Sequence, residues 1–244
     1  MNEKTLIAVS AYSGDLHQVE ANLQCYNHHE CPVLILSPKD GAIPSVSDKK
    51  VKCIMAGEKG WIGPQTLKRQ REFLRILSEQ RADYFLFNDA DSVCLSPKIP
   101  DYLYDPAHMD VFWSNEVTDA NPAPTMLPRI AMQPPYFFHR DVLRKIIRSS
   151  ATPALSFTQR PYPNGKLPEP TACIDHWMLQ IVYAANVRHR SFPDGASFET
   201  TSEHGLNTMR EHVGRQGKIF IHQVKTRKVL DTLLVDRRFY LEQK

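Results

Sequence analysis

Two aspartates separated by one residue are the side chains in this sequence best suited to chemistry. Asp89 and Asp91 directly follow the apolar run 84–87, which has the composition of a buried β-strand. Two carboxylates this close repel each other unless a cation compensates them. Mg²⁺ and Mn²⁺ can be held by few carboxylates and then keep positions open for diphosphate oxygens. The spacing therefore predicts a site for Mn²⁺ or Mg²⁺ that also binds a phosphorylated ligand.

The surroundings of this short pattern favour the metal site over its alternative, a polar turn capped by aspartates. A glycine-bearing loop at 57–63 leads into a helix with Pro64 near its first turn. On this helix Lys68, Arg71 and Arg75 recur at i, i+3 and i+7 and form a basic stripe. A basic helix shortly before paired carboxylates suits the binding of an anionic ligand.

Alternating strands and helices must position these side chains. Buried strands are expected at 6–9, 33–36, 51–55 and 84–87, and a helix at 16–26. Apolar runs without polar alternation are typical of parallel strands covered on both faces. In open sheets of this kind, ligands bind outside the carboxyl ends of the strands, which is where the two aspartates are predicted to lie.

The second half of the chain has a different character. Prolines crowd between 122 and 170, and further elements are expected as a strand at 136–138, helices at 142–147 and 174–185, and a late strand at 218–224. No internal repeat or linker divides the sequence, so we expect one domain.

The bulk properties exclude several classes of protein. With 244 residues, 42% hydrophobic residues and a net charge of +3, the chain can bury a core and has no general charge excess for coating nucleic acid. No secretory signal precedes the first strand, and no apolar run is long enough for a membrane span. We therefore expect a cytoplasmic protein with five reduced cysteines.

Five segments, in order along the chain, resemble the GT-A glycosyltransferases near the inverting family 2 group. They are 11–13 (AYS), 85–91 (FLFNDAD), 137–143 (FFHRDVL), 173–177 (CIDHW) and 221–225 (IHQVK). The resemblance implies an α/β, Rossmann-like fold with a single mixed, mostly parallel central sheet flanked by helices. It also implies one glycosyltransferase domain over 1–244, with a nucleotide-sugar-binding half at 1–115 and an acceptor-side half at 116–244.

The resemblance further implies a donor site. The residues expected to bind the nucleotide sugar are Ala11, Tyr12, Ser13, Asp15, Trp61, Lys68, Arg71, Asn88, Asp89 and Ala90. Lys68 or Arg71 would approach the diphosphate or the sugar, although a solvated helix face explains both equally well. Trp61 would stack on the sugar or the base, and its alternative is a loop aromatic packed on the core.

Two more roles follow from the resemblance. Asp175, at the start of the helix expected over 174–185, matches the general base of inverting enzymes, and its alternative is stabilisation of the helix N-terminus. The family often has Glu-Asp here, whereas this chain has Ile174-Asp175. His222 matches the histidine that completes the metal shell beside Asp89 and Asp91, with His204 in reserve. The alternative for His222 is a packed strand residue.

These features predict a metal-dependent glycosyltransferase that moves a sugar from a nucleoside-diphosphate sugar, UDP-sugar favoured, to an acceptor hydroxyl with inversion. The acceptor stays open among a glycan, a protein, a small molecule and a modified nucleic-acid base. A sugar-nucleotide nucleotidyltransferase is an alternative, although the segment 10–14 (SAYSG) has too little glycine for its phosphate loop. A non-catalytic nucleotide-sugar-binding module is another.

Local positive charge in the second half would suit an anionic acceptor, and a solvated surface explains it as well. The residues concerned are Arg188, His189, Arg190, Arg210, Arg215, Lys218, Lys225, Arg227 and Lys228.

Overall fold

Four strands built from apolar runs form the parallel part of the central sheet. They are β1 (Thr5–Ser10), β2 (Val33–Ser37), β3 (Val51–Met55) and β4 (Tyr84–Asp89). The computed structural model describes residues 5–11, 16–26, 31–37, 50–56, 64–118, 130–149, 174–197, 203–222, 224 and 226–242. The four strands lie in the order β3-β2-β1-β4 and run in one direction, as expected.

Three further strands extend the sheet beyond β4. They are β7 (Ile130–His139), β6 (Val111–Thr118) and β8 (Arg188–Ser191). β7 is antiparallel to both β4 and β6, whereas β8 runs parallel to β6 at the edge. Four of the six neighbouring pairs are therefore parallel, which confirms the mixed, mostly parallel sheet. Stacked rings join the antiparallel part, with Phe138 lying 5.7 Å from Phe85 and 5.2 Å from Phe112 between centroids.

A second, three-stranded sheet was not expected from the sequence. It consists of β5 (Val93–Cys94), β9 (Gly195–Ser197) and β10 (Phe220–His222), in the order β5-β10-β9. Strands of two or three residues are too short to show a period of two. The late strand expected at 218–224 is therefore present only as the shorter β10.

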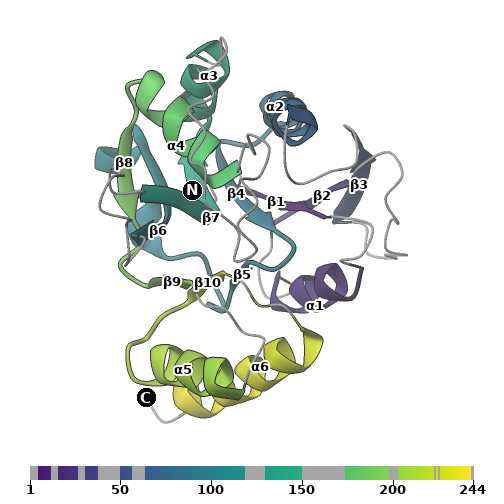
Figure 1. Cartoon of the computed structure of the whole chain (residues 1–244), viewed down its shortest axis with the longest axis vertical. Helices are drawn as coiled ribbons and strands as arrows, with labels where there is room; N and C mark the ends of the chain where they lie inside the picture. The colour runs from purple at the N-terminus through teal and green to yellow at the C-terminus, as the bar shows by residue number, and fades with distance from the viewer. Residues whose placement is uncertain are drawn as a thin grey trace, which may run out of the picture.

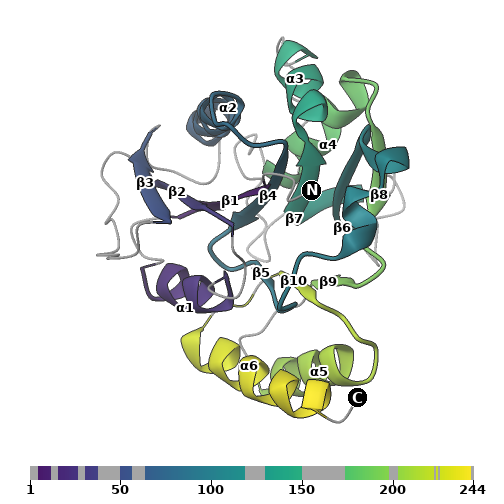
Figure 2. The same ribbon diagram turned by 180° about the vertical axis from the view of Figure 1, so that it is seen from behind.

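Helices cover both faces of the central sheet (Figures 1 and 2). On one face lie α2 (Pro64–Ser78), α3 (Arg140–Ser149) and α4 (Ile174–Ala184), and on the other α1 (Leu16–Tyr26). Two further helices, α5 (Glu203–Gly214) and α6 (Arg227–Glu242), pack together beyond the small sheet. Two 3-10 helices, Asp101–Tyr104 and Pro106–His108, join β5 to β6. The first four helices were expected, whereas α5 and α6 were not.

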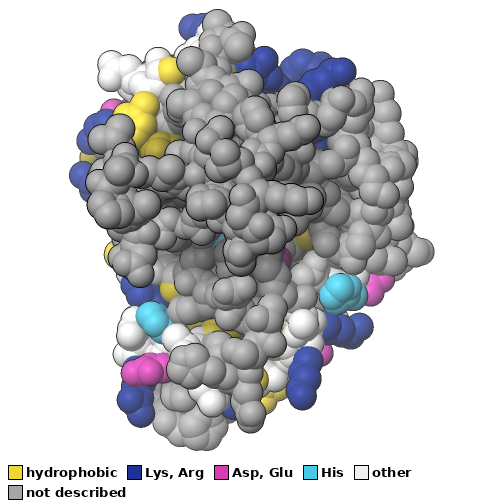
Figure 3. All heavy atoms as spheres, viewed as in Figure 1, with side chains coloured by type: hydrophobic (Ala, Val, Ile, Leu, Met, Phe, Trp, Pro, Cys, Tyr) yellow, Lys and Arg dark blue, Asp and Glu magenta, His cyan; other side chains and the backbone are white. Residues whose placement is uncertain are grey.

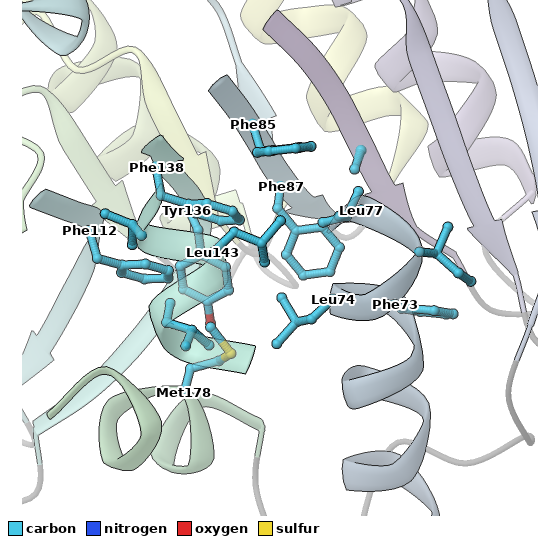
Figure 4. Packing of buried hydrophobic residues seen from close by; sticks show 14 of the residues in the cluster. Phe73, Leu74, Leu77, Phe85, Phe87, Phe112, Tyr136, Phe138, Leu143 and Met178 are labelled. Carbon is cyan, nitrogen blue, oxygen red and sulfur yellow. The ribbon is translucent and has the colours of Figure 1, made fainter. Parts of the chain in front are cut away.

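The core has two layers because successive strand residues point to opposite faces of the sheet. Ala8, Leu34 and Phe87 belong to the cluster under α2, α3 and α4. Figure 4 shows Leu74 of α2 turned toward the aromatic side chains of this cluster, to which Phe73 also belongs. The alternate strand residues pack with α1, and a third cluster joins α5 and α6 to the small sheet. This alternation decides which side chains at a strand end reach which helix.

The described helices include none that is long and apolar enough to cross a membrane. Four of the five cysteines are described, and none of these four, Cys25, Cys31, Cys53 and Cys94, forms a disulfide. The boundary expected between residues 115 and 116 falls inside β6, and one sheet contains strands from both halves.

The position of β9 depends on the absence of a side chain at Gly195. A Cβ there would lie 2.1 Å from Asn115 Oδ1 and 2.9 Å from Phe192 Cβ. Asn115 is buried, and its amide donates to the carbonyl oxygens of Pro134 and Ala196 at 3.2 and 3.4 Å. Asn115 therefore cannot easily move away from an added Cβ, because its side chain is held by these two hydrogen bonds.

We expect Gly195→Ala to lower the free energy of unfolding by about 1–3 kcal/mol, as over-packing does. Chemical denaturation followed by circular dichroism would measure the change. Gly217→Asn serves as the control, because Gly217 has φ +66 with no atom within 4 Å of an added Cβ, and asparagine tolerates that conformation. Equal stability of Gly195→Ala and the wild type would show that the fit at β9 is loose.

Candidate functional site

The aspartate turn lies at the carboxyl edge of the parallel strands. Ser10 is paired in register with Asp89, and the Ala90 N–H donates to Ser10 O at 2.9 Å. The Ser92 N–H donates to Asp89 O at 2.9 Å and closes the turn. Next to β4 the sheet changes from parallel to antiparallel pairing. Changes of strand order and direction at this edge are where open α/β sheets bind ligands.

Asp91 and His222 are brought together from distant parts of the chain. His222 ends β10, and its Nδ1 lies 3.6 Å from Asp91 Oδ1. The Val224 N–H donates to Asp91 O at 2.8 Å, which fixes the two segments to each other. Both side chains are largely buried, with 8% of His222 and 15% of Asp91 exposed. Of the three predicted metal ligands, Asp91 and His222 therefore lie next to each other.

The donor set of this pair fits Mn²⁺ or Mg²⁺. A carboxylate and an imidazole are ordinary ligands of such ions, Mn²⁺ above all. Two adjacent ligands at about 2.0–2.2 Å from one ion are roughly 3–3.6 Å apart, which matches the separation of Asp91 Oδ1 from His222 Nδ1. Ser92 Oγ lies 2.5 Å from the same nitrogen and occupies its one in-plane bonding position, so a metal ion would bind Nδ1 only in place of this hydrogen bond. Since a Ser-His-Asp triad uses the two opposite ring nitrogens, these three residues do not form one.

Asp89 is not gathered with this pair. Within the described ranges, no three His, Cys, Asp or Glu side chains are close enough together to hold a metal ion. Strand alternation instead turns Asp89 toward the face covered by α2, where Ser10 also lies. A two-residue site suits ions of this class, because Mg²⁺ is commonly bound by one or two carboxylates together with substrate phosphates and water.

Asn88 lies on the opposite face and supports the turn from beneath. Its side chain is fully buried, and its amide donates to the hydroxyl of Tyr26 on α1. Burial raises the pKa of Tyr26 well above its ordinary value, so the phenol stays neutral and donates to Ser92 O at 3.5 Å. The predicted contact between Asn88 and the donor is not supported by this placement. The polar chain instead links α1 to the aspartate turn.

The two alanines predicted for the donor site are buried beside it. The Ala11 N–H donates to Leu36 O at 2.9 Å, so Ala11 prolongs the sheet beyond β1. Ala90 is 3% exposed, and its carbonyl oxygen accepts a hydrogen bond from Asn22 of α1. If Ala11 or Ala90 contacts a nucleotide sugar, the contact would be made by its backbone or by its Cβ.

The cations predicted on α2 are on its outer surface. Lys68 and Arg71 are exposed, and Lys and Arg side chains gather over α2 and α3 in Figure 3. Arg75, the third residue of the stripe, forms an i, i+4 ion pair with Glu79. This arrangement is that of a solvated helix face. Because Lys68 and Arg71 are both exposed, packing does not hold either side chain at the carboxyl edge of the sheet.

The buried cation of this helix is Arg69. Arg69 is 0% exposed, and its guanidinium carbon lies 5.6 Å from the centroid of the Phe73 ring. Because α2 joins parallel strands β3 and β4, it runs against them, and its first turns lie at their carboxyl edge. Arg69 and Gln70 continue the buried stripe of Phe73 and Leu74 toward that edge. Their spacing of three and four residues from these apolar side chains was the signal for their burial.

Two buried polar side chains near this edge have hydrogen-bonding capacity to spare. Ser10 and Gln70 are each 1% exposed, and neither the Ser10 hydroxyl nor the Gln70 amide has a hydrogen-bond partner in the described part of the chain. Unpartnered buried polar groups are rare in folded proteins. On the α2 face, they mark a place where polar groups of a ligand can bind.

Several predicted residues cannot be placed. Tyr12, Ser13, Asp15 and Trp61 lie outside the described residues. Asp175 is in the first turn of α4, which begins at Ile174 as expected, but its side chain is outside the described part. The side chain of His204, in the first turn of α5, is likewise outside it.

Comparison with known proteins supports the fold. No family model and no curated protein matches the sequence. The apo form of the glycosyltransferase GlyE from Streptococcus pneumoniae is similar, with a TM-score of 0.50 and 11% identity, over 99% of this chain and 64% of that chain. A 2-C-methyl-D-erythritol 4-phosphate cytidylyltransferase from Thermus thermophilus has a TM-score of 0.43 and 14% identity, over 76% of this chain and 86% of its own.

At 11% identity the likeness to GlyE shows the fold alone. It confirms the expected Rossmann-like architecture, a mixed and mostly parallel central sheet flanked by helices. This chain spans 64% of the length of the GlyE chain.

Replacement of Arg69 and of Arg71 by methionine separates the buried cation from the exposed one. We expect Arg69→Met to weaken the binding of UDP in the presence of Mn²⁺ by roughly 10- to 100-fold, which corresponds to the loss of a hydrogen bond from a charged group. Arg71→Met should bind within about twofold of the wild type, because solvent screens its charge. Isothermal titration calorimetry measures both, and thermal unfolding checks that each variant is folded. Weaker binding in Arg71→Met alone would reverse the assignment.

Proposed function

We propose that this protein is a metal-dependent glycosyltransferase that moves a sugar from a nucleoside-diphosphate sugar to an acceptor hydroxyl. The observation that carries the proposal is the approach of Asp91 and His222 to 3.6 Å beside the carboxyl edge of a parallel sheet. A pair at this edge suits a divalent ion that faces a diphosphate. A UDP-sugar is the favoured donor.

The chemistry requires charge stabilisation and positioning more than covalent catalysis. When bound by Asp91 and His222, Mn²⁺ or Mg²⁺ would neutralise charge that builds on the leaving nucleoside diphosphate. Arg69 would add a second, buried positive charge on the α2 face, where Asp89 also points. The Ser10 hydroxyl and the Gln70 amide would form hydrogen bonds with the nucleotide sugar on that face.

Asp175 is our candidate for the general base. A carboxylate in the first turn of α4 would accept the proton of the acceptor hydroxyl as that oxygen attacks the anomeric carbon, and the configuration would invert. In this proposal no sugar is attached to the enzyme, and the nucleoside diphosphate is the only other product.

An uncharged acceptor hydroxyl suits the second half better than a polyanion does. Three of its exposed arginines are paired with carboxylates, which reduces the local positive charge. The pairs are Arg188 with Asp110, Arg215 with Glu211 and Arg227 with Asp231. We therefore favour a glycan, a protein or a small metabolite as the acceptor over a nucleic-acid base.

The proposed function is tested by product analysis. With Mn²⁺ and a panel of nucleotide sugars, we expect release of the nucleoside diphosphate together with a glycosylated product. Pyrophosphate formed from a nucleoside triphosphate and a sugar phosphate would instead identify a nucleotidyltransferase. Tight donor binding without turnover would identify a non-catalytic module.

Asp91→Asn is the variant that tests the metal assignment. We expect it to lower turnover by roughly 100-fold or more, because the metal charge would no longer be held beside the leaving group. Chelation of the metal should have the same effect on the wild type. The control is Asp83→Asn, since Asp83 is an exposed carboxylate beside the other end of β4. Undiminished turnover of Asp91→Asn would show that this site does not hold the metal.

A further inference from the structure

The Asp91–His222 pair is built from two segments that must be held at a fixed separation. Asp91 belongs to the turn after β4, and His222 ends β10 in the small sheet. Beside the direct bond from Val224 N–H to Asp91 O, a third element, α1, contacts both segments.

Two side-chain amides of α1 reach the backbone on both sides of the pair. Asn22 donates from Nδ2 to Ala90 O, the carbonyl directly before Asp91. Gln18, one helical turn earlier, donates from Nε2 to Val224 O at 3.4 Å, two residues after His222. Residues at i and i+4 share one face of a helix, so a single rigid element spans both segments.

Asn22 is the stronger of these two contacts. Its side chain is 1% exposed, and Ala90, whose carbonyl oxygen it binds, is also held through its own N–H, which donates to Ser10 O. Within the described structure, Asn22 Oδ1 has no hydrogen-bond partner, so the bond to Ala90 O is the one that its amide supplies. The unpartnered Oδ1 costs desolvation free energy, which the hydrogen bond from Nδ2 to Ala90 O partly offsets.

We infer that Asn22 is a positioning residue that sets the separation of Asp91 and His222 for metal binding, with Gln18 as its partner on the same helix face. The inference rests on the proposed function, because it assigns the pair to the metal. Asn22 does not touch the ion or the donor. It acts through the Ala90 carbonyl, which precedes the ligand Asp91 by one peptide bond.

The loss of a hydrogen bond to a metal ligand typically weakens metal affinity 10- to 100-fold, and because Asn22 acts one residue away from Asp91 we expect an effect at the lower end of that range. Asn22→Asp is nearly isosteric but replaces the donor with an acceptor that faces the Ala90 carbonyl oxygen. Asn22→Leu removes the polar group at similar volume. Gln24→Leu is the control, because Gln24 is exposed on the same helix.

The experiment is a titration of Mn²⁺ in the presence of UDP, followed by the electron paramagnetic resonance signal of the free ion. We expect Asn22→Asp and Asn22→Leu to raise the dissociation constant of Mn²⁺ by roughly tenfold. At saturating Mn²⁺, kcat should return to within about threefold of the wild type, since an outer-shell residue changes occupancy of the site rather than its chemistry. Gln24→Leu should match the wild type in both measurements.

The outcomes separate this inference from the proposed function. If the wild type binds Mn²⁺, Asp91→Asn does not, and both Asn22 variants bind within twofold of the wild type, Asn22 has no positioning role while the metal site stands. If the wild type does not bind Mn²⁺ with UDP, the proposed function fails, and this inference fails with it. Should the Asn22 variants not fold, Gln18→Leu, at a half-buried position, is expected to weaken Mn²⁺ binding in the same direction. Unchanged binding there would overturn the inference.

Discussion

The in-register pairing of β1 with β4 is the constraint on which the rest of the site depends. It sets Ser10 opposite Asp89 and brings the Ala90 N–H onto Ser10 O, so the aspartate turn begins at the carboxyl edge. A slip of one residue would move every side chain of β4 to the other face. Asn88 would then face α2, and Asp89 would be turned into the polar chain under α1. The placement of both thus depends on the register rather than on the turn.

The two faces of the sheet use buried polar groups in different ways. On the α1 face, Asn22 and Tyr26 donate hydrogen bonds to backbone carbonyl oxygens of the aspartate turn, and Asn88 donates to the Tyr26 hydroxyl. These bonds stabilise the backbone of the turn. On the α2 face, Ser10 and Gln70 keep polar atoms without partners among the described residues, and on the α1 face Asn22 Oδ1 and Asn88 Oδ1 do so as well. The faces differ in the hydrogen bonds that are made, because the α1 side chains hold the backbone of the turn, whereas the Ser10 and Gln70 side chains have no partner in the described structure. This arrangement suits a rigid support behind a site that opens toward α2.

Local patterns predicted strands β1 to β4, part of β7, the first four helices and the position of the aspartates, because each depends on a continuous run of residues. They did not predict β6 or β8. The small sheet was missed because its strands have two or three residues each and their pairing is long-range. The approach of His222 to Asp91 followed from the family resemblance and not from any local pattern. On α2, charge drew the prediction to Lys68 and Arg71, although the spacing from Phe73 already pointed to burial of the intervening Arg69.

The small sheet has a consequence for the order in which the molecule assembles. β10 pairs with β5, which lies more than a hundred residues earlier, and with β9, so three distant segments must meet before His222 is in place. Closing such long loops carries an entropic cost that short strands repay poorly, whereas β1, β2 and β4 pair over much larger buried surfaces. The small sheet is therefore the part expected to open first and to form last. A chain whose central sheet is complete can still lack the approach of His222 to Asp91, so folding of the sheet and completion of the proposed site become separate events.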